Sequence, residues 1–135
     1  MTTFTLSLAE FARAAPEQAR AVVRKVATDV LTKTVLRSPV DTGRFRANWA
    51  TSFGAPSYRV TSDTDASGQI AITRGARTIS RAYGDYPIYI TNSLPYALPL
   101  EYGYSKQAPA GMVRITVAEF QTFVDNAVRT TKAAK

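Results

Sequence analysis

The sequence predicts an α+β domain in which long amphipathic helices near both ends of the chain pack on a small, mostly antiparallel sheet of three or four strands. Apolar residues recur with helical period over about 16–36 and again over about 110–131. Short alternating runs occupy the strand-rich middle, residues 47–92. With 45% hydrophobic and 20% charged side chains, residues 1–135 are expected to form one globular domain.

Two helices are predicted near the N-terminus. Ser7 and Glu10 have the spacing of a capping box, which predicts a short helix over about 8–14. Pro16 suits the first turn of a long helix over about 16–36, because a proline there loses no hydrogen bond. The apolar stripe of this long helix comprises Ala19, Val22, Val23, Val26 and Val30.

The middle of the chain is predicted to form strands joined by turns. Alternating apolar residues predict strands in NWATSF (48–53), YRV (58–60), QIAIT (69–73) and YPIYIT (86–91). The polar stretch 61–68 is expected to be a turn or an exposed loop. A short helix is predicted over about 75–82.

The segment 93–111 is expected to be a loop that serves as an interface. Gly103 suits the left-handed residue after a short helical turn, although Pro99 prevents one continuous helix from Pro95. A final helix is predicted over about 110–131. Its apolar face comprises Val113, Val117, Phe120, Val124, Ala127 and Val128.

The composition excludes several function classes. The chain has no Cys and no His, which excludes disulfides, thiolate chemistry, Ser-His triads and zinc sites built from His. No cofactor is expected. No apolar run approaches the roughly 18–20 residues that span a bilayer, and the N-terminus lacks a basic signal region, so no membrane partner is expected. The net charge of +7 is compatible with a nucleic-acid or acidic protein partner.

The tripeptide Asp41-Thr42-Gly43 raises the question of an aspartic protease. Such enzymes need two carboxylates that share a proton in apolar surroundings. Here Arg44 and Arg46 follow at once, and they would hold the pKa of an adjacent carboxyl down. The preferred interpretation is structural: Asp41 or Thr42 caps a short turn, after which Phe45 and Trp49 enter the core.

Two motifs carry a family resemblance. SPVDTGRFRANW follows the long helix, and IYITNSLPYALPLEYGYSKQAPAGMVRITVAEF precedes the last one. In this order and spacing they resemble the neck and tail-completion (head–tail joining) proteins of long-tailed bacteriophages, the family to which the tail-completion protein Z of phage lambda is likened. The resemblance covers roughly residues 7–128, and Pro99 departs from it.

The resemblance implies a structural, non-catalytic virion protein at the head–tail junction, made in the host bacterial cytoplasm. It further implies a ring of about six copies, neighbouring head-closure or connector, tail-terminator or tail-tube proteins, and transient contact with double-stranded DNA. The nominated motif positions are Asp41, Thr42, Gly43 and Arg44 in the first motif, and Tyr96, Glu101, Tyr102, Gly103, Ser105, Lys106 and Met112 in the second.

The segment PYALPLEYGYSKQ is expected to supply one surface of the ring contact. On this hypothesis, Tyr96, Tyr102 and Tyr104 pack against the neighbour, while Glu101 and Lys106 set the register.

The alternative function is a sequence-independent, basic DNA-binding module. It depends on the sequence pI of about 10.0 and on a face of the long helix formed by Arg13, Arg20 and Arg24. The same face could instead line a DNA channel or bind an acidic protein. No helix-turn-helix, zinc-finger or RNA-stacking motif is present in the sequence.

Overall fold

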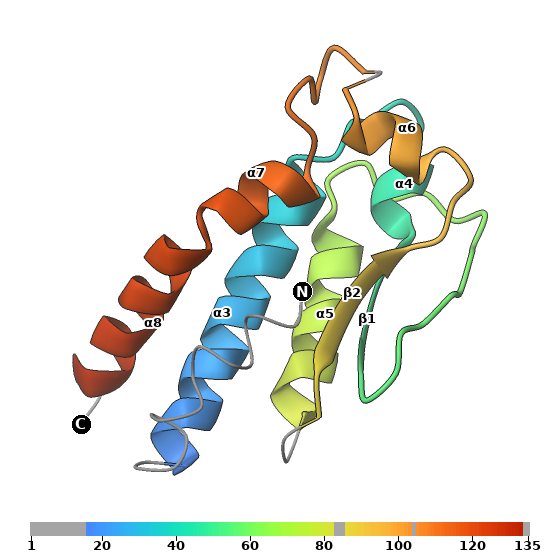
Figure 1. The fold of residues 1–135 in the computed structure, drawn as a ribbon. Helices are drawn as coiled ribbons and strands as arrows, with labels where there is room; N and C mark the ends of the chain where they lie inside the picture. The colour runs from blue at the N-terminus through green and yellow to red at the C-terminus, as the bar shows by residue number, and fades with distance from the viewer. Residues whose placement is uncertain (1–15, 83–85, 104, 134–135) are drawn as a thin grey trace.

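The computed structural model describes residues 16–82, 86–103 and 105–133 of the chain (Figure 1). The fold is α+β, as predicted. Its elements are α3 (Pro16–Leu36), α4 (Arg44–Ala47), β1 (Trp49–Phe53), α5 (Gln69–Arg81), β2 (Ile88–Asn92), α6 (Ala97–Glu101), α7 (Val113–Ala118) and α8 (Phe120–Ala133). The predicted short helix over 8–14 lies outside the described residues.

The sheet of the described chain has two strands rather than three or four. β1 and β2 pair antiparallel, with Trp49 opposite Asn92 and Phe53 opposite Ile88. The stretch 58–60, predicted as a strand, is exposed and carries no strand pairing. A two-stranded sheet is marginally stable on its own, so its stability depends on α5, which packs against β1 (Figure 1).

Helix α3 is the centre of the packing and occupies the residues predicted for the long helix. It contacts α8 on one side and α5 on the other, so that the elements follow in the order α8, α3, α5 and sheet (Figure 1). Its residues Val22 and Val26 pack with Phe123 and Ala127 of α8. Further along the chain, its buried side chains Ala27, Leu31 and Val35 join the larger core, which also contains Phe45, Trp49, Ile79 and Met112.

Helix α5 corrects two predictions. The stretch 69–73, predicted as a strand, and the helix predicted over 75–82 belong to one helix. A short apolar alternation fits both periods, and the buried positions Ala71, Gly75 and Ile79 show the helical spacing of four. Gly75 allows close packing here, because a Cβ would lie 2.3 Å from Leu31 Cδ2 and 2.6 Å from Thr51 Oγ1.

The predicted helix over 110–131 is interrupted at Glu119, which separates α7 from α8. Arg37, just beyond the end of α3, donates a 3.0 Å hydrogen bond to Thr116 Oγ1 and forms an ion pair with Glu119. The interruption changes the apolar face that the sequence predicted. Val117, which was predicted to lie on the buried face, is half exposed, whereas Phe123, which was not, is buried.

Candidate functional site

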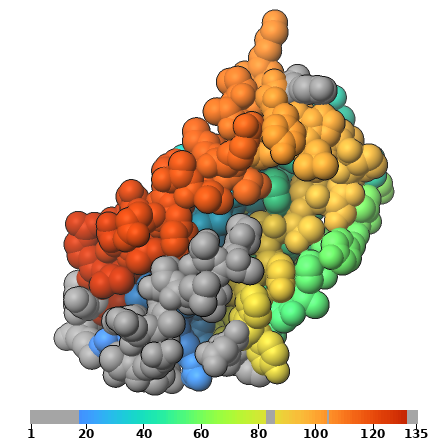
Figure 2. Space-filling view, in the orientation of Figure 1, coloured from blue at the N-terminus to red at the C-terminus, as the bar shows by residue number. Residues whose placement is uncertain are grey.

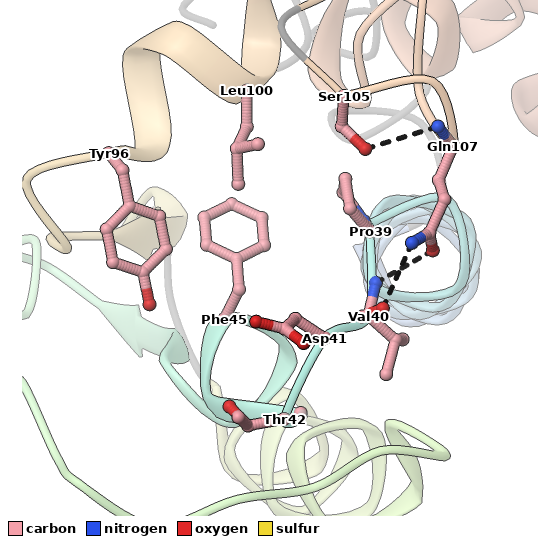
Figure 3. A pocket seen from close by; sticks show the side chains of 10 residues that line it. Pro39, Val40, Asp41, Thr42, Phe45, Tyr96, Leu100, Ser105 and Gln107 are labelled. Carbon is pink, nitrogen blue, oxygen red and sulfur yellow. Dashed lines mark hydrogen bonds between the residues drawn. The ribbon is translucent and has the colours of Figure 1, made fainter.

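The two motif segments, 38–49 and 93–112, meet at the end of the molecule where α4 and α6 lie (Figure 1). The side-chain amide of Gln107 joins them. Its Oε1 accepts a 2.9 Å hydrogen bond from the Val40 N–H, and its Nε2 donates a 3.0 Å bond to the Val40 carbonyl (Figure 3). Through these two hydrogen bonds, one side chain joins two irregular segments that are far apart in sequence.

A hollow of about 400 Å³ opens where the motifs meet (Figure 3). It has apolar and aromatic walls, several hydroxyl groups and one charged side chain. The lining residues are Pro39, Val40, Asp41, Thr42, Gly43, Phe45, Tyr96, Leu100, Ser105 and Gln107. The rings of Phe45 and Tyr96 lie 5.9 Å apart, which holds the start of α6 against α4. We call this feature the motif hollow.

The first motif bends at Gly43, whose φ of 90° is in the left-handed region. A Cβ at this position would lie 2.5 Å from the backbone nitrogen of Ala66, so the loop before α5 fits only against glycine. The Gly43 carbonyl also accepts a 2.9 Å hydrogen bond from the Asp65 N–H. Gly43 is therefore the point at which the motif and this loop are joined.

The capping prediction named Asp41 or Thr42; the N-cap position of α4 is Gly43, and of the two only Thr42 bonds to the turn. The Thr42 hydroxyl accepts a 3.2 Å hydrogen bond from the N–H of Arg44, the first residue of α4. Asp41 does not cap the turn: its side chain is exposed, and its carboxylate takes part in no hydrogen bond or ion pair with the described residues. Phe45 and Trp49 are buried in the core, as the structural interpretation required.

The motif arginines hold backbone rather than a ligand. Arg44 Nε donates a 3.1 Å hydrogen bond to the Thr61 carbonyl. Arg46 donates to three carbonyls, those of Leu36, Ser38 and Ala66, at 2.9, 3.1 and 2.9 Å. These bonds could not be predicted from the sequence, because their acceptors are main-chain atoms of irregular segments.

The second motif is held by Glu101, whose side chain is largely buried. Its carboxylate accepts hydrogen bonds of 3.0, 2.8 and 3.0 Å from the backbone N–H groups of Met112, Val113 and Arg114. These are amides at the start of α7, where a carboxylate is favourable with the helix dipole. Arg114 Nε adds a 3.1 Å ion pair. Glu101 thus has an intramolecular role that the sequence did not reveal.

These contacts set the ionisation of Glu101. Burial by itself would raise the pKa of this carboxyl, but the hydrogen bonds from the Arg114, Met112 and Val113 amides and from the Arg114 side chain outweigh it. The pKa of Glu101 is therefore lower than usual. The folded protein favours the ionised carboxylate that holds α7.

Two glycines allow the segment between α6 and α7 to fold back on Glu101. Gly103 has a φ of 87° just after α6, as predicted, and a Cβ there would lie 2.6 Å from the Pro109 carbonyl oxygen. Gly111 has a φ of 85°, and a Cβ would lie 2.5 Å from Glu101 Oε2. In Figure 2 the folded-back segment (orange) projects from the top of the molecule.

The remaining nominated residues lie on the outer surface of this end. Tyr102 is 65% exposed and has the guanidinium of Arg114 5.0 Å from its ring centre. Tyr96 is 39% exposed and Lys106 is exposed. The Ser105 hydroxyl accepts a 3.1 Å hydrogen bond from the Gln107 N–H. Tyr104 lies outside the described residues.

An apolar residue that the sequence analysis did not nominate joins this surface. Leu98 is 69% exposed and lies one helical turn before Tyr102 on α6, so both side chains share a face. We call Leu98 and Tyr102 the α6 face. The sequence indicates this face through the i, i+4 spacing of Leu98 and Tyr102 in a helix of only five residues, which is too short to bury both.

The arginine face predicted on the long helix is not assembled as expected. Arg24 is half-buried, and its guanidinium donates a 3.2 Å hydrogen bond to the Ala82 carbonyl at the end of α5. It ties two helices together. Arg20 is exposed, and Arg13 lies outside the described residues.

The chemistry of the motif hollow is that of a binding surface. Asp41 is its only carboxylate, and it is exposed, which does not match the desolvated pair of an aspartic protease. Over the described ranges, no group of three or more acidic, His or Cys side chains could hold a metal ion. No helix in the same ranges is long and apolar enough to cross a membrane.

An exposed aromatic and apolar surface beside a weakly charged hollow is typical of a contact between proteins. The sequence matches the family described as "Bacteriophage HK97-gp10, putative tail-component" over residues 3–103. The chain belongs to this family and is a structural component of a bacteriophage tail, with its place in the virion. Comparison with curated proteins and with solved structures found no significant match. The narrower likeness to the lambda tail-completion protein Z stays a prediction.

Proposed function

We propose that this tail component completes the upper end of the tail tube and joins it to the head. It would do so as a closed ring of identical copies, six if it follows the sixfold symmetry of such tubes. The observation that carries this proposal is the α6 face. Two large side chains, Leu98 and Tyr102, are exposed on one face at the end of the molecule that the two motifs build. Such a surface is typical of a protein contact.

A ring contact is heterologous, which means that one surface of each copy meets a different surface of the next. The α6 face fits one side of such a contact because it is rigidly supported. Glu101, at the end of α6, is hydrogen-bonded to the start of α7, and the Tyr96 ring packs on Phe45. A supported face loses little conformational entropy when a partner covers it.

The ring would surround the path of double-stranded DNA. The net charge of +7 supports a diffuse attraction to phosphate, which allows DNA to slide, and the exposed Arg20 on α3 is a candidate for the side nearest DNA. The alternative of a free-standing DNA-binding module has weaker support. Arg24, one of its three nominated residues, is engaged with the Ala82 carbonyl.

The proposal is tested by phage that lack this chain. Electron microscopy of their lysates should show filled heads and tails that are not joined, and supply of the wild-type chain should restore joined particles. Joined, infectious particles without the chain would contradict the junction role. The DNA-module alternative instead requires that the purified chain retards duplex DNA at moderate salt.

The role of the α6 face has a matched test. Leu98→Asp should fold normally and fail to restore joining, because a charge would enter an apolar contact. Tyr58→Asp is the control, since Tyr58 is exposed to a similar extent, 73% against 69%, but lies in the segment between β1 and α5. Equal complementation by both variants would remove the α6 face from the contact.

A further inference from the structure

We propose that the motif hollow receives a cationic side chain from a second copy of this chain, with the carboxylate of Asp41 as its partner. This inference rests on the proposed ring and names the chemistry of its contact. It also gives a role to Asp41, the only charged residue that lines the motif hollow. The Asp41 carboxylate has no hydrogen-bond or ion-pair partner among the described residues.

The hollow has the chemistry that a guanidinium or ammonium group requires. None of its ten lining residues is a Lys or Arg, and Asp41 is its single charge. The Tyr96 ring and Leu100 form part of its wall, so they can pack on the apolar stem or the flat face of an arginine (Figure 3). A cation placed there would meet an unpaired carboxylate beside an aromatic surface.

Asp41 differs from most other acidic side chains of the described chain. Asp29, Asp65, Glu101, Glu119 and Asp125 each have a hydrogen-bond or ion-pair partner within the chain. Asp63 has no such bond but is close enough to Arg74 for their charges to interact: burial and Arg59 lower the pKa of Arg74, and Asp65 and Asp63 partly oppose this. Asp41 alone combines an unpaired carboxylate with a position inside a hollow.

Charge favours a second copy as the source of the cation. Copies that each carry a net charge of +7 repel one another, so a ring needs contacts in which opposite charges meet. The chain has 10 Asp and Glu residues against 17 Lys and Arg residues, so carboxylates are the scarcer half of any such contact. An unpaired Asp41 in a concave site is the available acidic half of such a contact.

The donors that fit best are Arg77 and Arg81 on α5. They are exposed and one helical turn apart, and neither guanidinium takes part in a hydrogen bond or ion pair with the described residues. They lie toward the C-terminal end of α5, which points away from α4 and α6 (Figure 1). Because α5 is about 20 Å long, the acidic and basic halves lie on different surfaces, as a heterologous contact requires.

The test is a charge exchange in the full-length chain, followed by sedimentation velocity at low and moderate salt. Asp41→Arg alone, or Arg77→Asp with Arg81→Asp, should weaken self-association by about tenfold or more, in the range of close interfacial charge pairs. All three changes together should restore association to within about threefold of the wild type, because each contact regains opposite charges.

Two variants serve as controls. Asp63→Arg makes the same charge change as Asp41→Arg, at an exposed carboxylate outside the hollow. Lys33→Asp makes the same charge change as Arg77→Asp, at an exposed cation on α3. Both should associate like the wild type after correction for net charge. Circular dichroism and thermal unfolding of every variant separate loss of contact from loss of fold.

The outcomes distinguish this inference from the junction role. Wild-type association of Asp41→Arg, no rescue in the combined variant, or a wild-type chain that stays monomeric would each overturn the inference. The junction role would stand in all three cases if phage without the chain still fail to join heads to tails. Conversely, normal joining without the chain would overturn the junction role, while rescue of self-association would still support the contact.

Discussion

The two ends of the molecule are held together in different ways. At one end, α3 and α8 are joined by apolar packing of Val22 and Val26 with Phe123 and Ala127. At the other, the two motif segments share an apolar core that includes Phe45, Trp49 and Met112, and hydrogen bonds from side chains to backbone, such as those of Gln107 to Val40, are added to it. The motif end also exposes Leu98 and Tyr102 on one face of α6, whereas other exposed large apolar side chains lie elsewhere on the molecule.

This difference explains how a small chain can present an interface. Backbone groups in irregular segments must be hydrogen-bonded when they are removed from water. The polar side chains of the motif end meet this requirement, so its irregular segments are held in place while Leu98 and Tyr102 stay exposed. In the helical end, backbone hydrogen bonds form within each helix, and apolar packing holds α3 and α8 together.

Phe123→Ala should destabilise the helical end most. Truncation of a buried phenylalanine typically costs about 3–5 kcal/mol through lost burial and a residual cavity, and Phe123 is buried between α8 and α3. Urea unfolding should report this loss. Val117→Ala on the exposed side of α7 is the control and should change stability by less than about 0.5 kcal/mol; equal effects would contradict the packing described for α8.

Gly43→Ala should destabilise the motif end by about 2–4 kcal/mol. The left-handed conformation costs a residue with a Cβ roughly 1–2 kcal/mol, and the added clash with Ala66 increases this. Gly54→Ala separates the two terms. Gly54 has nearly the same φ, 87° against 90°, but a Cβ there meets only the Tyr86 ring at 3.8 Å. If thermal unfolding shows equal losses, the joint between Gly43 and the loop before α5 is unimportant.

Glu101→Gln should cost about 2 kcal/mol near neutral pH, because a charged acceptor of three amides and the Arg114 pair are lost. The folded protein lowers the pKa of Glu101, so the stability it contributes is present above the ordinary value of about 4.3 and is lost as pH falls through the lowered pKa.

The free energy of unfolding should therefore be measured for both proteins at about pH 7 and about pH 3. The gap between wild type and Glu101→Gln should narrow at the lower pH. A gap that stays constant would show that the carboxylate charge does not hold α7.

Asp41→Asn should have the smallest effect on stability, below about 0.5 kcal/mol, because the Asp41 carboxylate has no partner within the described chain. Thr42→Ala provides the comparison, since the Thr42 hydroxyl accepts from the Arg44 N–H and its loss should cost about 1 kcal/mol. A larger loss for Asp41→Asn than for Thr42→Ala in urea unfolding would show that Asp41 has a structural partner after all.

The parts of the fold that could be predicted from the sequence are those that depend on residues close together in the chain. Helix α3, strands β1 and β2 and the turn at Gly103 follow from periodicity and from local turn chemistry. Both depend on near neighbours in the chain. The second half of α5 was predicted as a helix, but residues 69–73 were predicted as a strand because their alternate apolar positions satisfy two periods. Gly75, which packs closely against Leu31 and Thr51, joins the two halves in one helix.

The site was less predictable than the fold. The motif positions were identified by resemblance, but the roles of Glu101, Gln107 and Arg46 depend on backbone atoms brought close by the fold. Glu101 appeared to be a surface charge that sets register, whereas it caps a helix that starts 12 residues later. Asp41 appeared to be a cap and is instead unpaired. Long-range polar contacts leave no periodic signal in a sequence.

The central claim is that the motif end contacts the neighbouring copy, which meets it through the exposed arginines of α5 and not through the packed pair of α3 and α8. A cryo-electron microscopy structure of the assembled upper end of the tail tests it most directly. We predict a closed ring in which the α6 face and the motif hollow are covered by the next copy, with Asp41 facing a cation of that copy. A ring that leaves α6 in solvent and joins its copies through α3 and α8, or a single copy of the chain, would contradict the account.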